Sequence, residues 1–136
     1  MKKIIAARYT DTSLSLGLFI LRITAGGVMI VAHGYDKLQH FSKYSAGFVD
    51  PFHIGIPASL SLDIFAEFFC SILVILGLLT RLAVIPLIIA MSVALFYVHH
   101  GDIAGDGERA GLYLAIFLAL LLAGPGRLSV DRLIGK

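Results

Sequence analysis

The sequence predicts an all-α membrane protein. We expect one transmembrane domain over residues 1–136, a bundle of four transmembrane helices with both the N- and C-termini in the cytoplasm. Three observations lead to this prediction. The chain is 58% hydrophobic and 15% charged, with a mean hydropathy of +0.91, whereas soluble domains carry roughly 25% charged residues. Its apolar residues gather in four segments of about the 20 residues that cross a hydrocarbon core. Basic residues are also divided unevenly between the two sides that these segments define.

The four apolar segments are separated by short motifs that contain glycine. We expect helices at about 14–33, 59–79, 82–100 and 109–124, with an outer loop at about 34–58. The separating motifs are HG at 33–34, GLLTR at 77–81, HHGD at 99–102 and GPG at 124–126. Pro86 falls in the first turns of the third segment, where the missing N–H of proline costs least.

The orientation follows from the basic residues. An even number of spans places both termini on one side, and that side would carry seven Lys and Arg residues against three on the other. The seven are Lys2, Lys3, Arg8, Arg81, Arg127, Arg132 and Lys136, and the three are Lys37, Lys43 and Arg109. Cytoplasmic loops carry the excess of Lys and Arg, so we expect both termini inside the cell.

The N-terminal MKK has the basic character of a signal-peptide start. The stretch that follows, IIAARYTDTS at 4–13, is interrupted by Arg8 and Asp11, and no small-residue cleavage site comes after it. We therefore expect the first helix to be retained as an anchor.

An arginine lies in the middle of the first apolar segment, GLFILRITAGGVM at 17–29. A charge at the centre of a bilayer costs from about 2.5 to more than 10 kcal/mol, so Arg22 needs a partner inside the bundle. Counted from the outer helix ends at about 1.5 Å per residue, Arg22 lies about 16 Å deep and Glu67 about 12 Å deep. We predict an intramembrane Arg22–Glu67 ion pair. The pair would either lock the helix register or belong to a functional site.

Helical spacing extends this pair into two polar faces. Arg22 and His33 share one face of the first helix, and Asp63, Glu67 and Cys70 share one face of the second. The third segment ends in two histidines, and the fourth carries a tyrosine near its outer end. We therefore predict a ligand cleft in the outer half of the bundle, formed by His33, Asp63, Cys70, His99, His100 and Tyr113.

The cleft residues favour some ligands over others, and no cofactor is assigned. A quinone or similar amphipathic ligand needs a few hydrogen-bonding groups in an apolar pocket, and a histidine or buried glutamate there would pass a proton. Haem or a metal fits less well, because the sequence has no CxxCH, HxxxH or HExxH motif. A metal site would have to be assembled from His33, Asp63, His99 and His100. The single cysteine allows neither an internal disulfide nor a CxxC pair.

The motifs in this order resemble the DoxX family of small four-helix bacterial membrane proteins. The resemblance covers nearly the whole chain. It rests on LRITAGGVMIVAHGYDKL (21–38), AEFFCSILVILGLLTRLA (66–83), the histidines at 99–100 and GPGRLSVD (124–131). It implies a multi-pass protein of the bacterial inner membrane that is associated with oxidoreductases, since family members are linked to quinol oxidase and to thiosulfate:quinone oxidoreduction. By position, the family pattern corresponds to Arg22, Lys37, Glu67, Arg81, His99 or His100, and Asp131.

Our leading functional hypothesis is an integral inner-membrane subunit of a redox system that binds a quinone or lipid-like ligand in the outer-half cleft. If it is an enzyme, it is an oxidoreductase subunit without its own electron carrier, and it needs a soluble or membrane redox partner. The alternatives are a non-catalytic scaffold that recruits a partner, with a structural Arg–Glu pair, and a small solute or ion carrier. The bilayer is the expected environment, and a homo-oligomer is compatible with the sequence. Nucleic-acid binding is not expected, because Lys and Arg form no block and do not alternate with aromatic residues.

Overall fold

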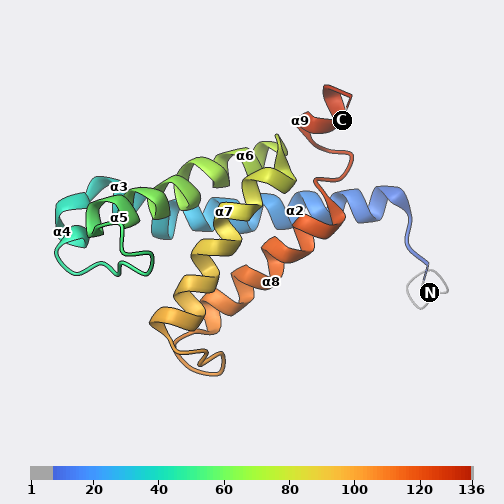
Figure 1. The fold of residues 1–136 in the computed structure, drawn as a ribbon. Coiled ribbons are helices and arrows are strands. Elements are labelled where there is room, and N and C mark those ends of the chain that lie inside the picture. The colour runs from blue at the N-terminus through green and yellow to red at the C-terminus, as the bar shows by residue number, and fades with distance from the viewer. Residues whose placement is uncertain (1–7, 136) are drawn as a thin grey trace.

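The computed structural model describes residues 8–135, and this part of the chain is all helical, as predicted (Figure 1). The first helix begins at a capping box in which the side chains of Thr10 and Ser13 each accept a hydrogen bond from the other's backbone N–H, both at 3.1 Å. It runs without a break through α2 (Asp11–Met29), the π-helical turn η1 (Ile30–Gly34) and α3 (Tyr35–Gln39). The short helix α4 (Phe41–Ser45) follows it.

Two further continuous helices follow the loop after α4. The second consists of α5 (Ile56–Ile64), η2 (Phe65–Cys70) and α6 (Ser71–Leu76), and the third of α7 (Thr80–Ser92) and η3 (Val93–Val98). Gly77, with φ of 70°, ends the second helix: its N–H and that of Leu78 bond back to the carbonyls of Val74 and Leu73. The left-handed conformation is the reason for a glycine there.

Three helices in residues 8–135 are long and apolar enough to cross a membrane. They are Asp11–Gln39, Ile56–Leu76 and Thr80–Val98, with mean hydropathies of 2.0, 2.0 and 2.2. The fourth predicted span corresponds to α8 (Glu108–Ala123), whose 16 residues extend about 24 Å against a hydrocarbon core of about 30 Å. A last short helix, α9 (Val130–Leu133), completes the chain.

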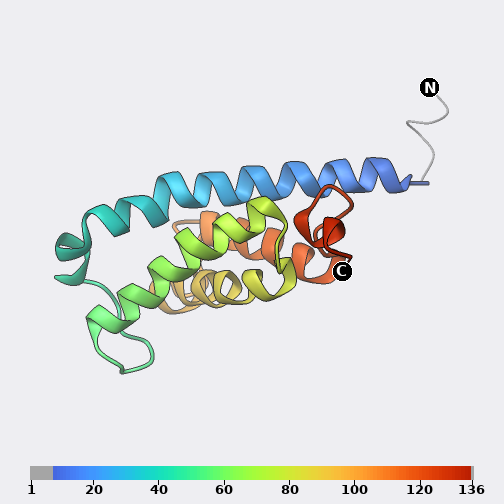
Figure 2. The same ribbon diagram turned by 90° about the horizontal axis from the view of Figure 1, so that it is seen from above.

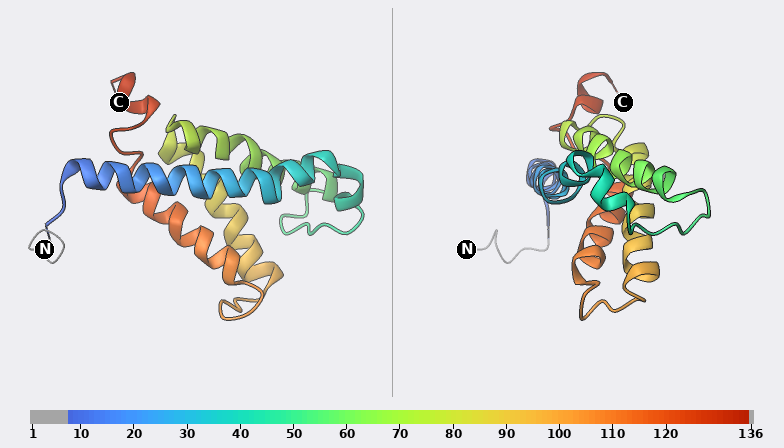
Figure 3. Two further views of the ribbon diagram at one scale, coloured as in Figure 1. Left: turned by 180° about the vertical axis from the view of Figure 1, so that it is seen from behind. Right: turned by 90° about the vertical axis from the view of Figure 1, so that its left-hand side faces the viewer.

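The helices form two pairs that share one core. The second helix packs along the first, and α7 and α8 form a hairpin that crosses them (Figures 1 and 2). The tip of this hairpin lies apart from the α3–α5 end of the molecule (Figure 3). The core contains Leu18, Ala25, Met29, Val74, Val84, Leu87, Phe117 and Leu120. Large apolar side chains such as Val31, Leu82 and Leu122 point outward, with 75%, 63% and 80% of their surface exposed, as helices in contact with lipid require.

The first helix is longer than predicted, and the outer loop is correspondingly shorter than 34–58. The HG motif at 33–34 predicts the end of a helix, but the backbone of Gly34 is helical, with φ of −62°. Its missing side chain serves a close helix contact instead, since a Cβ atom there would lie 2.7 Å from the carbonyl carbon of Glu67. The expectations for Lys2, Lys3 and Lys136 concern positions outside the described residues.

Candidate functional site

Arg22 is fully buried and bonds to main-chain carbonyls. Its Nη1 donates to the carbonyl oxygens of Val74 at 3.2 Å and Ile75 at 3.0 Å, and its Nη2 donates to the carbonyl of Leu128. Its Cζ also lies 5.5 Å from the ring centre of Phe19. We call Arg22 and these three carbonyls the Arg22 cluster. The last carbonyls of a helix lack intrahelical partners and carry partial negative charge, so the end of α6 is a favourable place for a cation.

The C-terminal segment closes the Arg22 cluster from the other side. The Asp131 carboxylate accepts hydrogen bonds from the backbone N–H groups of Leu79 at 2.8 Å and Thr80 at 3.1 Å, which caps the start of α7. Gly77 lies so close to Arg22 that a Cβ atom there would be 2.5 Å from Nη1. Within residues 8–135, Nε is the only Arg22 nitrogen without a hydrogen-bond partner. The cluster joins α2, α6 and the tail, and the Asp131 cap joins the tail to the start of α7.

A second polar group, the Lys37 cluster, consists of Lys37 on α3, Asp63 on α5 and Glu67 on η2. Lys37 Nζ donates to Asp63 Oδ2 at 2.5 Å and to Glu67 Oε2 and Oε1 at 2.8 and 3.0 Å. The side chains of Lys37 and Asp63 are 15% exposed and that of Glu67 is 3% exposed. Lys37 Nζ also lies 5.5 Å from the ring centre of Phe48. One cation is thus shared by two carboxylates.

The structure differs from the predicted Arg22–Glu67 pair, because Glu67 binds Lys37 and Arg22 binds carbonyls. The first helix continues to Gln39, which brings Lys37 to the level of Glu67. Arg22 lies about 15 positions earlier, roughly 22 Å along the helix axis. The depth comparison failed because it was measured from an end at residue 33. The missed signal was that Lys37 continues the Arg22–His33 face by one more turn.

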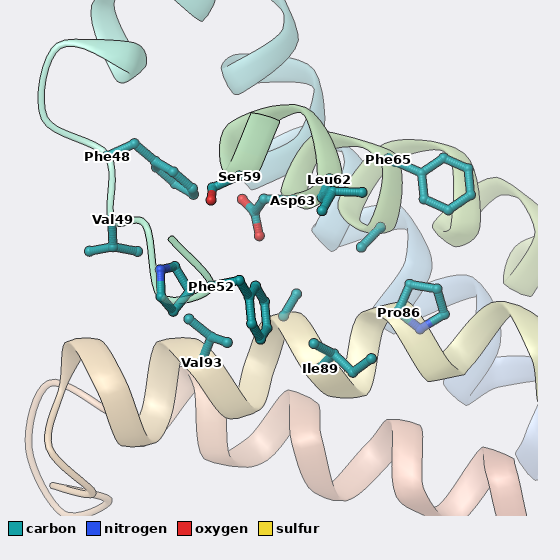
Figure 4. Close-up of a pocket in the computed structure, with 13 residues that line it drawn as sticks. Phe48, Val49, Phe52, Ser59, Leu62, Asp63, Phe65, Pro86, Ile89 and Val93 are labelled. Atoms are coloured by element: carbon teal, nitrogen blue, oxygen red, sulfur yellow. The ribbon is translucent and has the colours of Figure 1, made fainter. Parts of the chain in front are cut away.

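A cavity of about 320 Å³ lies beside the Lys37 cluster (Figure 4). The loop before α5, the α5 and η2 parts of the second helix, and the third helix form its walls. Its lining residues are Phe48, Val49, Pro51, Phe52, Ser59, Leu62, Asp63, Phe65, Ala66, Pro86, Ile89, Ala90 and Val93. Among these described residues, only Ser59 and Asp63 have polar side chains. In Figure 4 their oxygen atoms lie close together on the side of the cavity opposite Ile89 of α7 and Val93 of η3.

Asp50 holds the loop that covers this cavity. Its carboxylate accepts hydrogen bonds from Ser59 Oγ at 2.8 Å and from the backbone N–H groups of Ile54 at 3.0 Å and Gly55 at 2.9 Å. The Ser59 hydroxyl, helped by the two backbone donors and by His53, lowers the pKa of the Asp50 carboxyl below its usual value. The carboxylate therefore anchors the loop to the first turn of α5.

The other predicted cleft residues lie elsewhere. His33 is half-buried and packs edge-on against Tyr113, with ring centres 6.0 Å apart, and Tyr113 stacks on Phe117. Tyr113 faces a second hollow, between α2 and α8, that Arg109 also lines. Cys70 is a free, buried thiol that belongs to the apolar core.

The histidines at the end of the third helix do not join the Lys37 cluster. His99 and His100 follow η3 at the tip of the α7–α8 hairpin, which diverges from the α3–α5 end (Figure 1). In the part of the chain that the structure describes, no group of three or more His, Cys, Asp or Glu side chains is placed to hold a metal ion. The set His33, Asp63, His99 and His100 is therefore not brought together.

The sequence matches one family model and is similar to several bacterial proteins. The sequence model of the DoxX family, described as DoxX, matches residues 17–100. The chain is 33% identical over 127 residues to an uncharacterized membrane protein of Mycobacterium tuberculosis, covering 81% of this chain and 77% of that protein. It is 34% identical over 121 residues to an uncharacterized protein of Haemophilus influenzae, covering 84% and 87% of the two chains. No solved structure matches at a significant level. The family match includes Arg22 and the whole Lys37 cluster.

Proposed function

This chain belongs to the DoxX family, and from that premise we propose that it is a membrane subunit of a redox system that binds a quinone or other lipid-like ligand. The single observation that carries this proposal is the cavity beside the Lys37 cluster. Its volume of about 320 Å³ falls in the range of about 300–1,000 Å³ typical of small-molecule sites. Such sites combine apolar and aromatic walls with a few polar groups, which here are Ser59 and Asp63.

The proposed membrane arrangement has α8 as a fourth span, both termini in the cytoplasm and the cavity in the outer half of the bacterial inner membrane. The apolar run of α8 after Arg109 and its packing along α7 support the fourth span. Arg81 donates to the carbonyl of Leu122 at the opposite end of the molecule from the cavity loop, where a basic cytoplasmic face would lie.

The cavity walls offer a path for an amphipathic ligand. Phe65 and Ile89 line the cavity and are 49% and 48% exposed on the outer surface of the bundle, so an apolar tail would leave the cavity along them into lipid. The head group would meet Ser59 and Asp63 at the closed side. Because no group in the described chain is suited to carry electrons, a partner protein would exchange them with the ligand.

The test is ligand binding to the full chain in mild detergent. Mass spectrometry of the extracted small molecules would identify a co-purified ligand, and native mass spectrometry would measure binding of a short-chain alkyl benzoquinone and its reduced form. Ala90→Phe fills the cavity from α7, and we expect it to weaken binding about tenfold or more. Ala119→Phe on the exposed face of α8 is the matched control. Equal binding by the two variants would remove the cavity as the ligand site.

A non-catalytic scaffold is the second candidate, and the Arg22 cluster favours it. The donors of this buried charge go to main-chain carbonyls of α6 and the tail, which they join to α2, so Arg22 serves the fold. If no ligand binds and Ala90→Phe fully supports the activity of the partner redox system, the scaffold function replaces the ligand-binding one.

A further inference from the structure

We infer that the cavity selects ligands whose head group donates a hydrogen bond, so that a hydroxylated amphiphile such as a hydroquinone or phenol binds in preference to a quinone. This deepens the proposed function and depends on it, because it takes the cavity as the ligand site. It follows from the direction of the hydrogen bonds that the two polar lining residues already make.

Ser59 can only accept a hydrogen bond from a ligand. Its hydroxyl hydrogen is directed to Asp50 Oδ1, at an Oγ–Oδ1 distance of 2.8 Å. Asp50 is itself held by the N–H groups of Ile54 and Gly55, and an ionised carboxylate has no hydrogen to offer in return. The serine hydroxyl therefore keeps its hydrogen on the Asp50 side and presents lone pairs to the cavity.

Asp63 also presents an acceptor. Lys37 Nζ donates a charge-assisted hydrogen bond to its Oδ2 at 2.5 Å, in which the carboxylate is the acceptor. The ammonium hydrogens of Lys37 are directed to Asp63 and Glu67, and Lys37 is not among the residues that line the cavity. The side chains of the other lining residues are apolar. The described lining side chains thus offer acceptors and no donor.

This arrangement discriminates between the two redox forms of one ligand. The carbonyl oxygens of a quinone only accept hydrogen bonds, so they would face the lone pairs of Ser59 and Asp63 and leave them unpaired. A hydroquinone hydroxyl donates to those same atoms. Hydrogen bonds to charged groups contribute about 1.5–3 kcal/mol, which corresponds to a preference of roughly tenfold to hundredfold for the donor.

The experiment compares matched ligands on the full chain in detergent by native mass spectrometry. The redox-inert pair is para-decylphenol and its methyl ether, which differ in the donor hydrogen and a methyl group. The redox pair is decylhydroquinone and decylbenzoquinone, measured without oxygen. A monoacylglycerol tests whether an aliphatic hydroxyl on a lipid serves as well as an aromatic one. We expect the phenol and the hydroquinone to bind about tenfold to hundredfold more tightly than the ether and the quinone.

Variants test whether Asp63 sets this preference. Asp63→Asn introduces an amide donor and leaves Lys37 paired with Glu67, so we expect the phenol-to-ether ratio to fall toward one and quinone binding to improve. Glu67→Gln makes the same change of charge at a residue that does not line the cavity, and it should keep the preference for the phenol.

The outcomes separate this inference from the proposed function. If the quinone and the ether bind as tightly as their hydroxyl partners, and Ala90→Phe weakens all four, the cavity is the ligand site but the donor preference is wrong. If none of the probes binds, or Ala90→Phe affects none of them, the proposed ligand site and the donor preference both fail.

Discussion

Arg22 and Lys37 are two cations on one helix that are neutralised in different ways. Arg22 donates to three carbonyl oxygens of the backbone, and Lys37 donates to the side chains of Asp63 and Glu67 beside a cavity. Backbone carbonyls at a helix end can neither titrate nor change place without unfolding. Carboxylate side chains can do both, and they lie where a ligand would enter. The comparison therefore assigns one buried charge to stability and the other to binding.

The largest expected effect is loss of stability on removing Arg22. Arg22→Met removes the hydrogen bonds to the carbonyls of Val74, Ile75 and Leu128, of which Val74 keeps the Gly77 N–H as a donor. Each lost bond to a charged group is worth about 1.5–3 kcal/mol, so we expect the free energy of unfolding in detergent to fall by about 4–6 kcal/mol. Arg22→Lys should recover part of it, because an ammonium reaches fewer carbonyls than the guanidinium fork.

Chemical unfolding followed by circular dichroism measures this change, and ligand binding by the fraction that remains folded is the second readout. A stable Arg22→Met protein that no longer binds the phenol probe would reverse the assignment of the two clusters.

Removing Lys37 should damage both stability and binding. Lys37→Met leaves two carboxylates close together without a cation, and breaking a buried ion pair costs about 3–5 kcal/mol. The cluster is partly exposed, so we expect about 3 kcal/mol. The double variant Lys37→Met with Glu67→Gln should regain part of the stability, because it removes one of the stranded charges.

The same double variant separates the role of Lys37 in binding from its role in stability. Asp63 loses the ammonium that holds its carboxylate in place, so the preference for the phenol over its methyl ether should be weakened even where stability returns. Full recovery of that preference would show that Lys37 has only a structural role.

Much of the fold follows from the sequence, because composition and periodicity determine which segments are apolar helices. The all-helical chain and the membrane-crossing length of the first three helices are of this kind. Asp63 and Glu67 were also placed correctly on one face of the second helix, and the structure brings both to Lys37. Which residues share one face of a helix depends only on their spacing along the chain, so it can be predicted from a single sequence.

The partners of these residues could not be predicted, because they depend on where helices end and how they cross. The glycine at position 34 favours a helix end in the sequence, but in the structure it allows the first helix to approach the backbone of Glu67 closely. The helix continues for five more residues, and Lys37 is one of them. The bond from Arg22 to the Leu128 carbonyl spans the chain and requires the tail to fold back. His99 was expected in the cleft because the outer ends of all four spans were expected to lie together, whereas the α7–α8 hairpin diverges (Figure 1).

A smaller effect is expected at the tail side of the Arg22 cluster. Asp131→Ala removes the cap from the N–H groups of Leu79 and Thr80 at the start of α7, and such caps contribute about 0.5–2 kcal/mol. We expect the free energy of unfolding to fall by about 1–2 kcal/mol, with phenol binding by the folded protein unchanged. Asp131→Asn, which keeps one acceptor oxygen, should lose less. A selective loss of binding in Asp131→Ala would couple the tail to the cavity.

The smallest effect concerns the loop over the cavity and appears in acid. The pKa of Asp50 is lowered in the folded protein, chiefly by the Ser59 hydroxyl, so its carboxylate stabilises the loop above the ordinary aspartate pKa of about 3.9. That contribution is lost as the pH falls through the lowered pKa. The amide resonances of Ile54 and Gly55, which donate to Asp50, should therefore titrate in NMR spectra with a midpoint below about pH 3.9. Ser59→Ala should raise this midpoint, and Asp50→Asn should abolish it. A midpoint at or above the ordinary value would mean that Asp50 does not hold the loop, and the serine hydroxyl would then be free to donate into the cavity.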